Sequence, residues 1–327
     1  SGIAPWWTSS DTLLAFWRPL AALTHWVDYR LWPDSAALMH AHSLLWFGAV
    51  VFIVTLLYRQ FLGPTWMSGL AALFYALDES FYFPVASIAN RNALISLFFG
   101  VLLAPLAYWL AARVYGAHAG LLAAFLVAIS PYNVWYSQEV RMYTLGAVLG
   151  VGVLGAVLHV MSRPVSRQRS YLFWLALYVL CGSLGLWSLY YFAFLLVAAN
   201  LMLGLWWLIG WWKKRIGLGW LSRGLLARVA ILSVYAVWLP IAWRQATEPP
   251  VPPWRGMVAL GDLLVETWSA LSLGQSVVPA EVWPVLLLFG VLFVLGLFYR
   301  LAIARSTQNR HLPGPAEARR MRWVLAG

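Results

Sequence analysis

Charged side chains, acids above all, and cysteine are scarce in this chain. Only 10% of its 327 residues are Asp, Glu, Lys or Arg, whereas a soluble protein carries about 25%. The single cysteine, Cys181, excludes a disulfide within the chain and argues against a cysteine-ligated metal. Apolar residues are abundant instead, with 62% hydrophobic residues and 22 Trp. This composition excludes a soluble globular protein and predicts an all-α, polytopic integral membrane protein.

Long apolar runs locate the predicted membrane spans. A helix that crosses about 30 Å of hydrocarbon needs about 20 mainly apolar residues. The run 171–212 is too long for one crossing, so we place a turn near Gly182, Gly185 and the residues 188–191. The short run 117–132 ends at Pro131. About nine spans are predicted in all, over residues 42–58, 66–84, 92–112, 117–132, 143–161, 171–189, 190–212, 225–243 and 283–303.

Basic residues predict the orientation of these spans, because Lys and Arg concentrate in cytoplasmic loops. Of the 22 Lys and Arg, 16 fall on one side together with one acid, Glu317. The other side holds six arginines and the remaining ten acids. The formal net charge of +11 is therefore a topology signal, and it does not point to a nucleic-acid partner.

The spans define one membrane domain over residues 1–303 and a basic cytoplasmic tail over 304–327. Because residues 1–41 fall outside in this topology, we expect a first crossing, absent from this chain, before Ser1. The last outer loop contains an expected interfacial helix near 258–273. The outer loops are 1–41, 79–91, 133–142 and 244–282.

One outer segment, residues 130–146, combines an acid, an arginine and several aromatic residues. Pro131 ends one predicted span, and Glu139 and Arg141 stand at the outer start of the next. A helix N-terminus presents free N–H groups to an anion, and arginine binds phosphate through paired hydrogen bonds. The segment therefore fits a phosphate or pyrophosphate held at a membrane surface. The alternative is an interfacial helix start with an aromatic belt and a snorkelling arginine.

Three segments, 90–94, 111–116 and 137–143, resemble membrane glycosyltransferases of the GT-C fold. The likeness covers about residues 85–160 and is most specific at 137–143, which reads SQEVRMY. More narrowly, it resembles the superfamily of protein mannosyltransferases, aminoarabinose transferases and RgtA/B/C/D-like bacterial enzymes. This resemblance implies a GT-C-like protein of the bacterial inner (plasma) membrane, with its active site facing outward.

Further segments are similar to the same superfamily, in the order that it implies. One region contains Arg18, Asp28 and the sequence His40-Ala41-His42, and the other, 85–92, contains Arg91. The resemblance implies that a sugar passes from a polyprenyl-phosphate donor to a glycolipid, polysaccharide or protein acceptor in the lipid bilayer.

The resemblance also implies a set of donor-binding residues. Arg141 would contact the donor phosphate, and Glu139 would fix its orientation. Arg91, Tyr143 and Arg18 would line the same binding site.

Sugar transfer to a hydroxyl needs a carboxylate base, and a cation or metal that stabilises the departing phosphate. The related enzymes place an Asp-Asp or Asp-Glu motif directly after the first crossing. No such pair precedes Arg18, so either the motif lies upstream of Ser1 or Asp11 stands in for it. The adjacent acids Asp78 and Glu79 are candidates for a second carboxylate or a ligand of a divalent metal ion. An ion-paired helix end is the alternative for this pair.

Two other sequence patterns are weaker evidence for a functional site. His40 and His42 would point about 200° apart on a helix, so one shared metal ion requires an extended segment. The glycines of 150–155 spell G-x-G-x-x-G, but they lie within an apolar span with no strand before them. Small residues for close helix packing explain them.

A transporter or flippase of a lipid-linked substrate is the main alternative function. Such a protein is expected to have inverted repeats and ionisable residues near the membrane midplane. The sequence has no convincing repeat, and its ionisable residues fall at the ends of the predicted spans. A non-catalytic scaffold or decayed homologue is a third reading. The outer clustering of acids favours the transferase.

Overall fold

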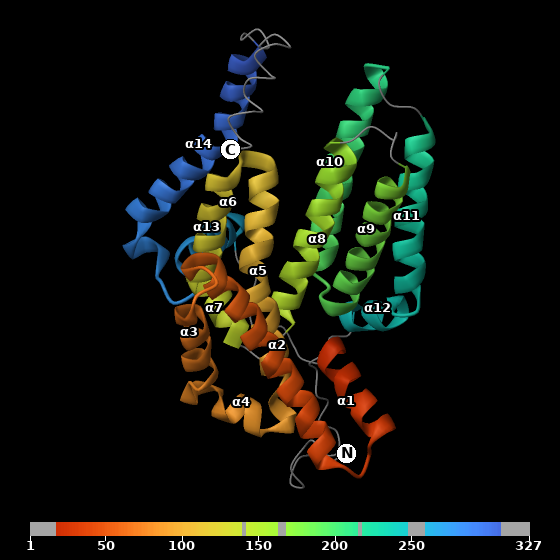
Figure 1. Ribbon diagram of the computed structural model, residues 1–327. Coiled ribbons are helices and arrows are strands. Elements are labelled where there is room, and N and C mark those ends of the chain that lie inside the picture. The colour runs from red at the N-terminus through yellow and green to blue at the C-terminus, as the bar shows by residue number, and fades with distance from the viewer. Residues whose placement is uncertain (1–17, 139–141, 163–167, 215–217, 248–258, 309–327) are drawn as a thin grey trace, which may run out of the picture. The chain divides into compact units, whose positions relative to one another are not determined.

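A computed structural model describes residues 18–138, 142–162, 168–214, 218–247 and 259–308 (Figure 1). All regular secondary structure in these ranges is helical. The chain divides into two compact units, Ser1–Met257 and Val258–Gly327.

The first half of unit 1 is built around α5, which packs against α2, α6, α7 and α8. Ser35 caps α2 by accepting a hydrogen bond from the Leu38 backbone N–H, and Gly63 and Gly116 end α2 and α5 with φ angles of 71° and 93°. Its elements are α1 (Pro19–Leu31), α2 (Ala36–Leu62), α3 (Trp66–Ala76), η1 (Glu79–Phe81), α4 (Tyr82–Ala86), η2 (Ile88–Asn90), α5 (Arg91–Tyr115), α6 (Ala117–Ile129) and α7 (Pro131–Gln138).

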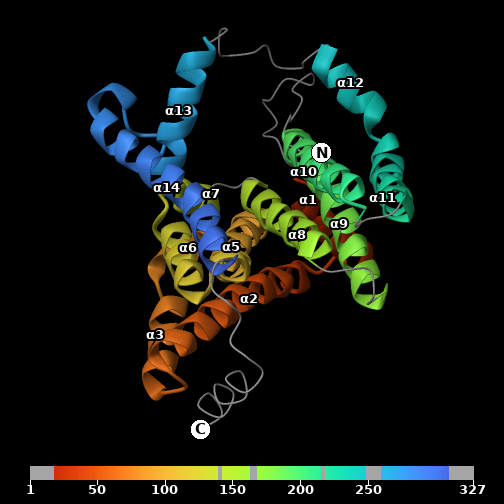
Figure 2. The ribbon, with the colours of Figure 1, turned by 90° about the horizontal axis from the view of Figure 1, so that it is seen from above.

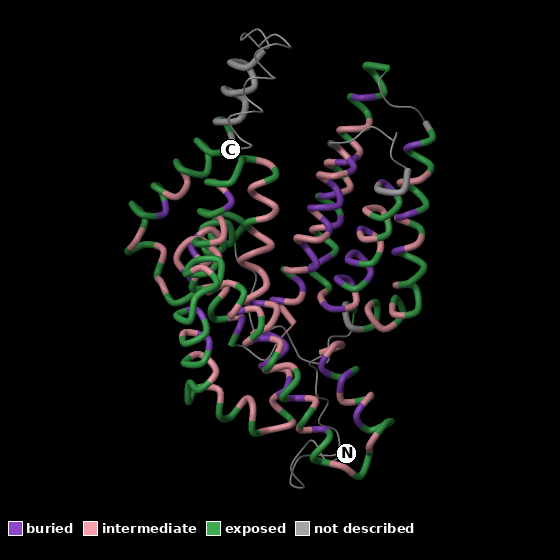
Figure 3. The backbone as a smooth tube through the Cα atoms, viewed as in Figure 1, coloured by how far each residue is buried: buried purple, intermediate pink, exposed green. Residues whose placement is uncertain are grey.

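The second half of unit 1 contains the largest buried cluster. The helices α8, α9, α10 and α11 lie side by side in both ribbon views (Figure 2). Their facing residues, such as Val153, Ala156 and Tyr178, form one apolar core, and buried positions gather on these helices in Figure 3. The elements are α8 (Tyr143–Ser162), α9 (Gln168–Ser188), α10 (Phe192–Trp212), α11 (Leu218–Ala236) and α12 (Leu239–Thr247).

Unit 2 consists of α13 (Leu260–Leu273), η3 (Pro279–Glu281) and α14 (Trp283–Gln308). The Trp268 indole N–H donates a hydrogen bond to the Leu286 carbonyl at 3.0 Å, which ties α13 to α14. The two helices border a groove lined by apolar side chains such as Leu264 and Val291. The helix expected near 258–273 is thus confirmed as a helix.

Five helices of the described ranges are long and apolar enough to cross a membrane: α2, α8, α10, most of α9, and η2 with α5. The pair α6 and α7, bent by 53° at Ser130, would make a sixth span. Most side chains in these spans are not fully buried within the protein, as expected when apolar surface faces lipid rather than water. The chain is therefore an all-α protein with several helices suited to a membrane.

Two predicted boundaries were wrong, and a third prediction was right in part. The span 66–84 stops at Ala76, because the chain turns at Asp78, whose carboxylate caps η1. The apolar helix predicted at 225–243 begins earlier, at Leu218, and ends at Ala236. The turn between α9 and α10 lies within the predicted residues 188–191, but Gly182 and Gly185, which were also assigned to it, are inside α9.

The glycines inside these helices make room for neighbouring side chains. A Cβ atom at Gly152 would lie 2.6 Å from the Cys181 Sγ, and one at Gly155 would lie 2.6 Å from the Trp109 ring. These approaches join α8 to α9 and to α5. The interpretation of 150–155 as a packing surface rather than a nucleotide motif is confirmed.

Candidate functional site

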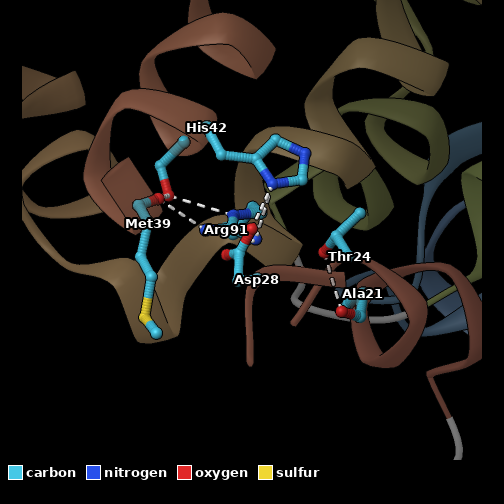
Figure 4. A network of polar contacts seen from close by, with 7 residues as sticks. Ala21, Thr24, Asp28, Met39, His42 and Arg91 are labelled. Atoms are coloured by element: carbon cyan, nitrogen blue, oxygen red, sulfur yellow. Dashed lines mark hydrogen bonds and ion pairs between the residues drawn. The ribbon is translucent and has the colours of Figure 1, made fainter. Parts of the chain in front are cut away.

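A buried polar network lies where α2 and α5 begin, and α1 covers it (Figure 4). At its centre is Arg91, the first residue of α5, whose side chain is 0% exposed. Its Nε donates to the Ser43 Oγ at 3.0 Å, and its Nη2 donates to the Met39 carbonyl at 2.7 Å. The guanidinium therefore binds two groups of α2.

Asp28 of α1 neutralises this arginine. Its carboxylate is 0% exposed, and its Oδ2 lies 2.5 Å from the Arg91 Nη1. The Oδ1 lies 2.6 Å from the Nδ1 of His42, a residue of α2 whose side chain is 21% exposed. One carboxylate thus joins three helices, because it bonds to residues of α2 and α5 from its position on α1.

The network fixes the tautomer of His42. An ionised carboxylate oxygen only accepts hydrogen bonds, so the Nδ1–H of His42 donates to the Asp28 Oδ1, and the Arg91 Nη1, 3.3 Å from the same nitrogen, does not donate to it. The Nε2 of a neutral ring is then the acceptor. The chemistry available here is an imidazole of fixed orientation, supported by a buried ion pair.

His25, on the same helix as Asp28, is sensitive to the network. Burial, and then the positive charge of Arg91, lower the pKa of His25 below its ordinary value of 6.5, although Asp28 opposes this shift. The unfolded chain therefore binds this proton more readily than the folded chain. Stability that is present above pH 6.5 is lost as the pH falls toward the lower folded pKa.

We expect a thermal unfolding midpoint that falls between about pH 7 and pH 5, and falls less steeply in His25→Gln. Scanning fluorescence of both proteins across this range measures the two slopes. A wild-type slope no steeper than that of the variant would contradict the role of His25.

A narrow pocket lies beside the network, at the same end of unit 1. It has room for little more than a water-sized group. Its wall includes Ser96, whose hydroxyl donates to the Tyr136 carbonyl at 2.9 Å, and Thr144, whose hydroxyl donates to the Ser96 carbonyl at 2.9 Å. These bonds join α5 to α7 and α8. The pocket is lined by Arg18, Pro19, Leu20, Ala21, Asn92, Ile95, Ser96, Phe99, Met142, Thr144 and Leu145.

The predicted donor-binding residues occupy different places. Arg18 lines the narrow pocket, whereas Arg91 lies in the buried network. Tyr143 begins α8 and packs its ring against Tyr136, with 4.5 Å between centroids. A direct phosphate contact does not fit Arg91, because its side chain is fully buried and bonded to protein groups.

The predicted acids Asp78 and Glu79 lie at an exposed turn. The Asp78 Oδ1 accepts a hydrogen bond from the Ser80 backbone N–H at 2.8 Å. Hydrogen bonds from the Ser80 side chain and backbone lower the pKa of Asp78. A lowered pKa makes a carboxylate a weaker base. Within the described ranges, the ion pair of Arg91 is made with Asp28 and not with these acids.

Three predicted residues, Asp11, Glu139 and Arg141, lie outside the described residues. Within the described ranges, no three His, Cys, Asp or Glu side chains are grouped so that they could hold a metal ion. The expected divalent ion stays a prediction, and His42 binds Asp28.

Sequence reasoning did not anticipate how Asp28, His42 and Ser43 meet Arg91. Asp28 was noted only within a segment that resembles the GT-C enzymes, and His42 only there and as part of a weak metal-binding pattern. Ser43 was not predicted to have a role. The available signal was an acid within α1, three residues after His25 and so on the same face of that helix. Comparisons of the chain with models of protein families, with curated proteins and with solved structures found no match.

Proposed function

We propose that this protein is a membrane glycosyltransferase that takes a sugar from a polyprenyl-phosphate donor at the non-cytoplasmic face. The observation that carries this proposal is a convergence of segments. Arg18, Asn92 and Met142 come from three separate segments that resemble GT-C enzymes, and they line the same narrow pocket. Sequence segments that are distant along the chain are expected to meet in this way when they serve one site.

The proposal gives each charged residue a distinct role. The narrow pocket marks where these segments meet and is too small to hold the donor itself. Arg18 offers a cation beside it, and Arg141, which adjoins the lining residue Met142 in sequence, contacts the donor phosphate. Glu139 orients Arg141. Among the acids of this sequence, the base that deprotonates the acceptor hydroxyl is Asp11, and Asp78 and Glu79 are secondary candidates.

Arg91 acts as a positioning residue in this proposal. Its ion pair with Asp28 holds α1 against α5. Arg18 lies directly before α1, so the buried ion pair sets the position of the cation that lines the pocket.

The nine spans and the GT-C architecture belong to the same proposal. The long helices α2, α5, α8 and α10 alternate with helices that return to the end at which these begin, as an up-and-down membrane topology requires. The end that carries the narrow pocket is the proposed outer face.

The test is an assay of donor cleavage by the full-length protein in membranes. Radiolabelled polyprenyl-phosphate hexoses and pentoses are supplied, and the release of polyprenyl phosphate is measured. We expect turnover with at least one donor, and a loss of about tenfold or more in Arg141→Ala, since hydrogen bonds to charged groups contribute about 1.5–3 kcal/mol. Unchanged turnover in Arg141→Ala would rule out its assigned role.

Arg30→Ala is the matched control. Arg30 is an exposed arginine at the end of α1, on the same side of the molecule, and it lies over the Trp26 ring at 5.5 Å. We expect it to keep wild-type turnover. Movement of the intact lipid-linked sugar across the membrane without cleavage would instead favour the transporter.

A further inference from the structure

The stretch that forms α8–α12 contains no acid. Between Glu139 and Glu248 the sequence has ten Lys and Arg and not one Asp or Glu. A basic side chain that lies within this bundle therefore has no carboxylate partner from the bundle itself. Its charge needs another anion, because an uncompensated charge in an apolar environment is unfavourable.

Arg228 is such a residue. It lies in the interior of α11 and is half-buried, and its Nε donates to the Asn200 Oδ1 of α10 at 2.6 Å. The same oxygen accepts a hydrogen bond from the Tyr178 hydroxyl of α9 at 3.0 Å. A Cβ atom at Gly224 would lie 3.0 Å from the Arg228 Nη1, so the guanidinium points back along α11 over this glycine.

Arg228 lines a mainly apolar cavity, whose lining residues include a few that carry hydrogen-bond donors. Two further lining residues, Tyr171 and Trp220, are only 6% and 7% exposed. The Tyr171 hydroxyl and the Trp220 indole N–H are buried and have no hydrogen-bond partner in the described part of the chain. Buried polar groups are nearly always bonded, so each of these atoms calls for a partner. The cavity is lined by Ala156, Val157, Val160, Tyr171, Leu175, Tyr178, Asn200, Leu203, Trp220, Gly224, Ala227 and Arg228.

We propose that this cavity binds a chloride-sized monatomic anion. Arg228 supplies the positive charge, and the Tyr171 O–H and Trp220 N–H supply further donors. The lining residues include no acid, so a cation is not expected there. The free space accommodates roughly one water-sized group, which a monatomic anion fits and a phosphate ester exceeds. A water molecule in this place would leave Arg228 without a counter-charge.

This site is separate from the proposed glycosyltransferase site. The chloride-sized anion is bound among α8, α9, α10 and α11, whereas the narrow pocket lies among α1, α5 and the start of α8. The anion would join these helices by compensating Arg228, whatever reaction the protein catalyses.

The test compares the thermal unfolding midpoint of the purified, delipidated full chain in chloride and in gluconate at constant ionic strength. We expect chloride and bromide to raise the midpoint saturably by about 2–4 °C, because a ligand that binds only the folded state stabilises it. Gluconate is too large for the cavity and is not expected to do so. Equal midpoints in chloride and gluconate would overturn the proposal.

Variants locate the anion. Arg228→Gln should abolish the chloride effect, whereas Arg113→Gln, an arginine packed over Trp109 of α5, should keep it. Tyr171→Phe keeps the ring and removes the hydroxyl, and Trp220→Phe replaces the indole with a smaller aromatic ring that has no N–H, so we expect about tenfold more chloride for half saturation in either variant. A chloride effect that persists in Arg228→Gln, or unchanged half saturation in both Phe variants, contradicts the site. Stabilisation by inorganic phosphate or an anionic lipid, and not by chloride, would overturn the monatomic assignment.

Discussion

Replacing Asp28 with alanine is expected to lower the free energy of unfolding by about 3–5 kcal/mol. The substitution removes the carboxylate from a site where Arg91 is fully buried, and so leaves a charge in the protein interior without its counter-ion. It also removes the acceptor that holds the Nδ1 of His42. The loss is therefore larger than that of an ordinary surface ion pair, which contributes about 0–1 kcal/mol. The change is measured by unfolding the micelle-solubilised protein with increasing amounts of a denaturing detergent.

Asp34→Ala is the matched control, because Asp34 is an exposed acid between α1 and α2. We expect a change within about 0.5 kcal/mol. The double substitution Asp28→Val/Arg91→Met removes both charges and replaces them with apolar groups of roughly similar volume. It should recover most of the stability, because apolar replacements of buried ion pairs are often neutral or stabilising. An Asp28→Ala protein as stable as Asp34→Ala would disprove the buried charge pair.

Replacing Gly185 with alanine is expected to destabilise the protein by about 1–3 kcal/mol, as overpacking of a core does. A Cβ atom there would lie 2.2–2.4 Å from three ring carbons of Phe192, which is only 5% exposed. Phe192 begins α10, just after the turn from α9, so its ring has little freedom to move. The same denaturation titration measures this loss.

Gly204→Ala on α10 gives the opposite expectation. No atom lies within 4 Å of a Cβ built at Gly204. Alanine is the better helix former by about 0.5–1 kcal/mol, so this variant should be slightly more stable than the wild type. If both glycine variants shift the free energy of unfolding in the same direction, the result would contradict the close contact of α9 with α10 at Gly185.

These two sites show what the sequence could and could not predict. The apolar runs at 143–161, 171–189 and 190–212 predicted α8, α9 and α10 to within a few residues, because membrane helices need long apolar segments. The turn was predicted correctly at 188–191, but Gly182 and Gly185, which were assigned to it as well, lie inside α9. Glycine marks both turns and close helix contacts, and only the neighbouring helices distinguish the two.

The polar network was harder to predict. Arg91 was recognised as a residue of interest, but its partners come from two other helices. Local periodicity relates residues three or four positions apart, and it has no bearing on the pairing of Arg91 with Asp28 or Ser43. The resemblance assigned Arg18 and Tyr143 to one binding site, and in the structure Arg18 and Met142 line the same narrow pocket. Whether Arg141 belongs to it stays a prediction.

The pairing of Asp28 with Arg91 also has a consequence for biosynthesis. Arg91 leaves the ribosome 63 residues after Asp28, which corresponds to roughly 3–13 s at typical elongation rates. During that interval the carboxylate of α1 lacks its partner Arg91. The nascent α1 must therefore wait at the membrane surface, and it docks only after the start of α5 has emerged. The helix α1 is thus made before its partner and assembled late.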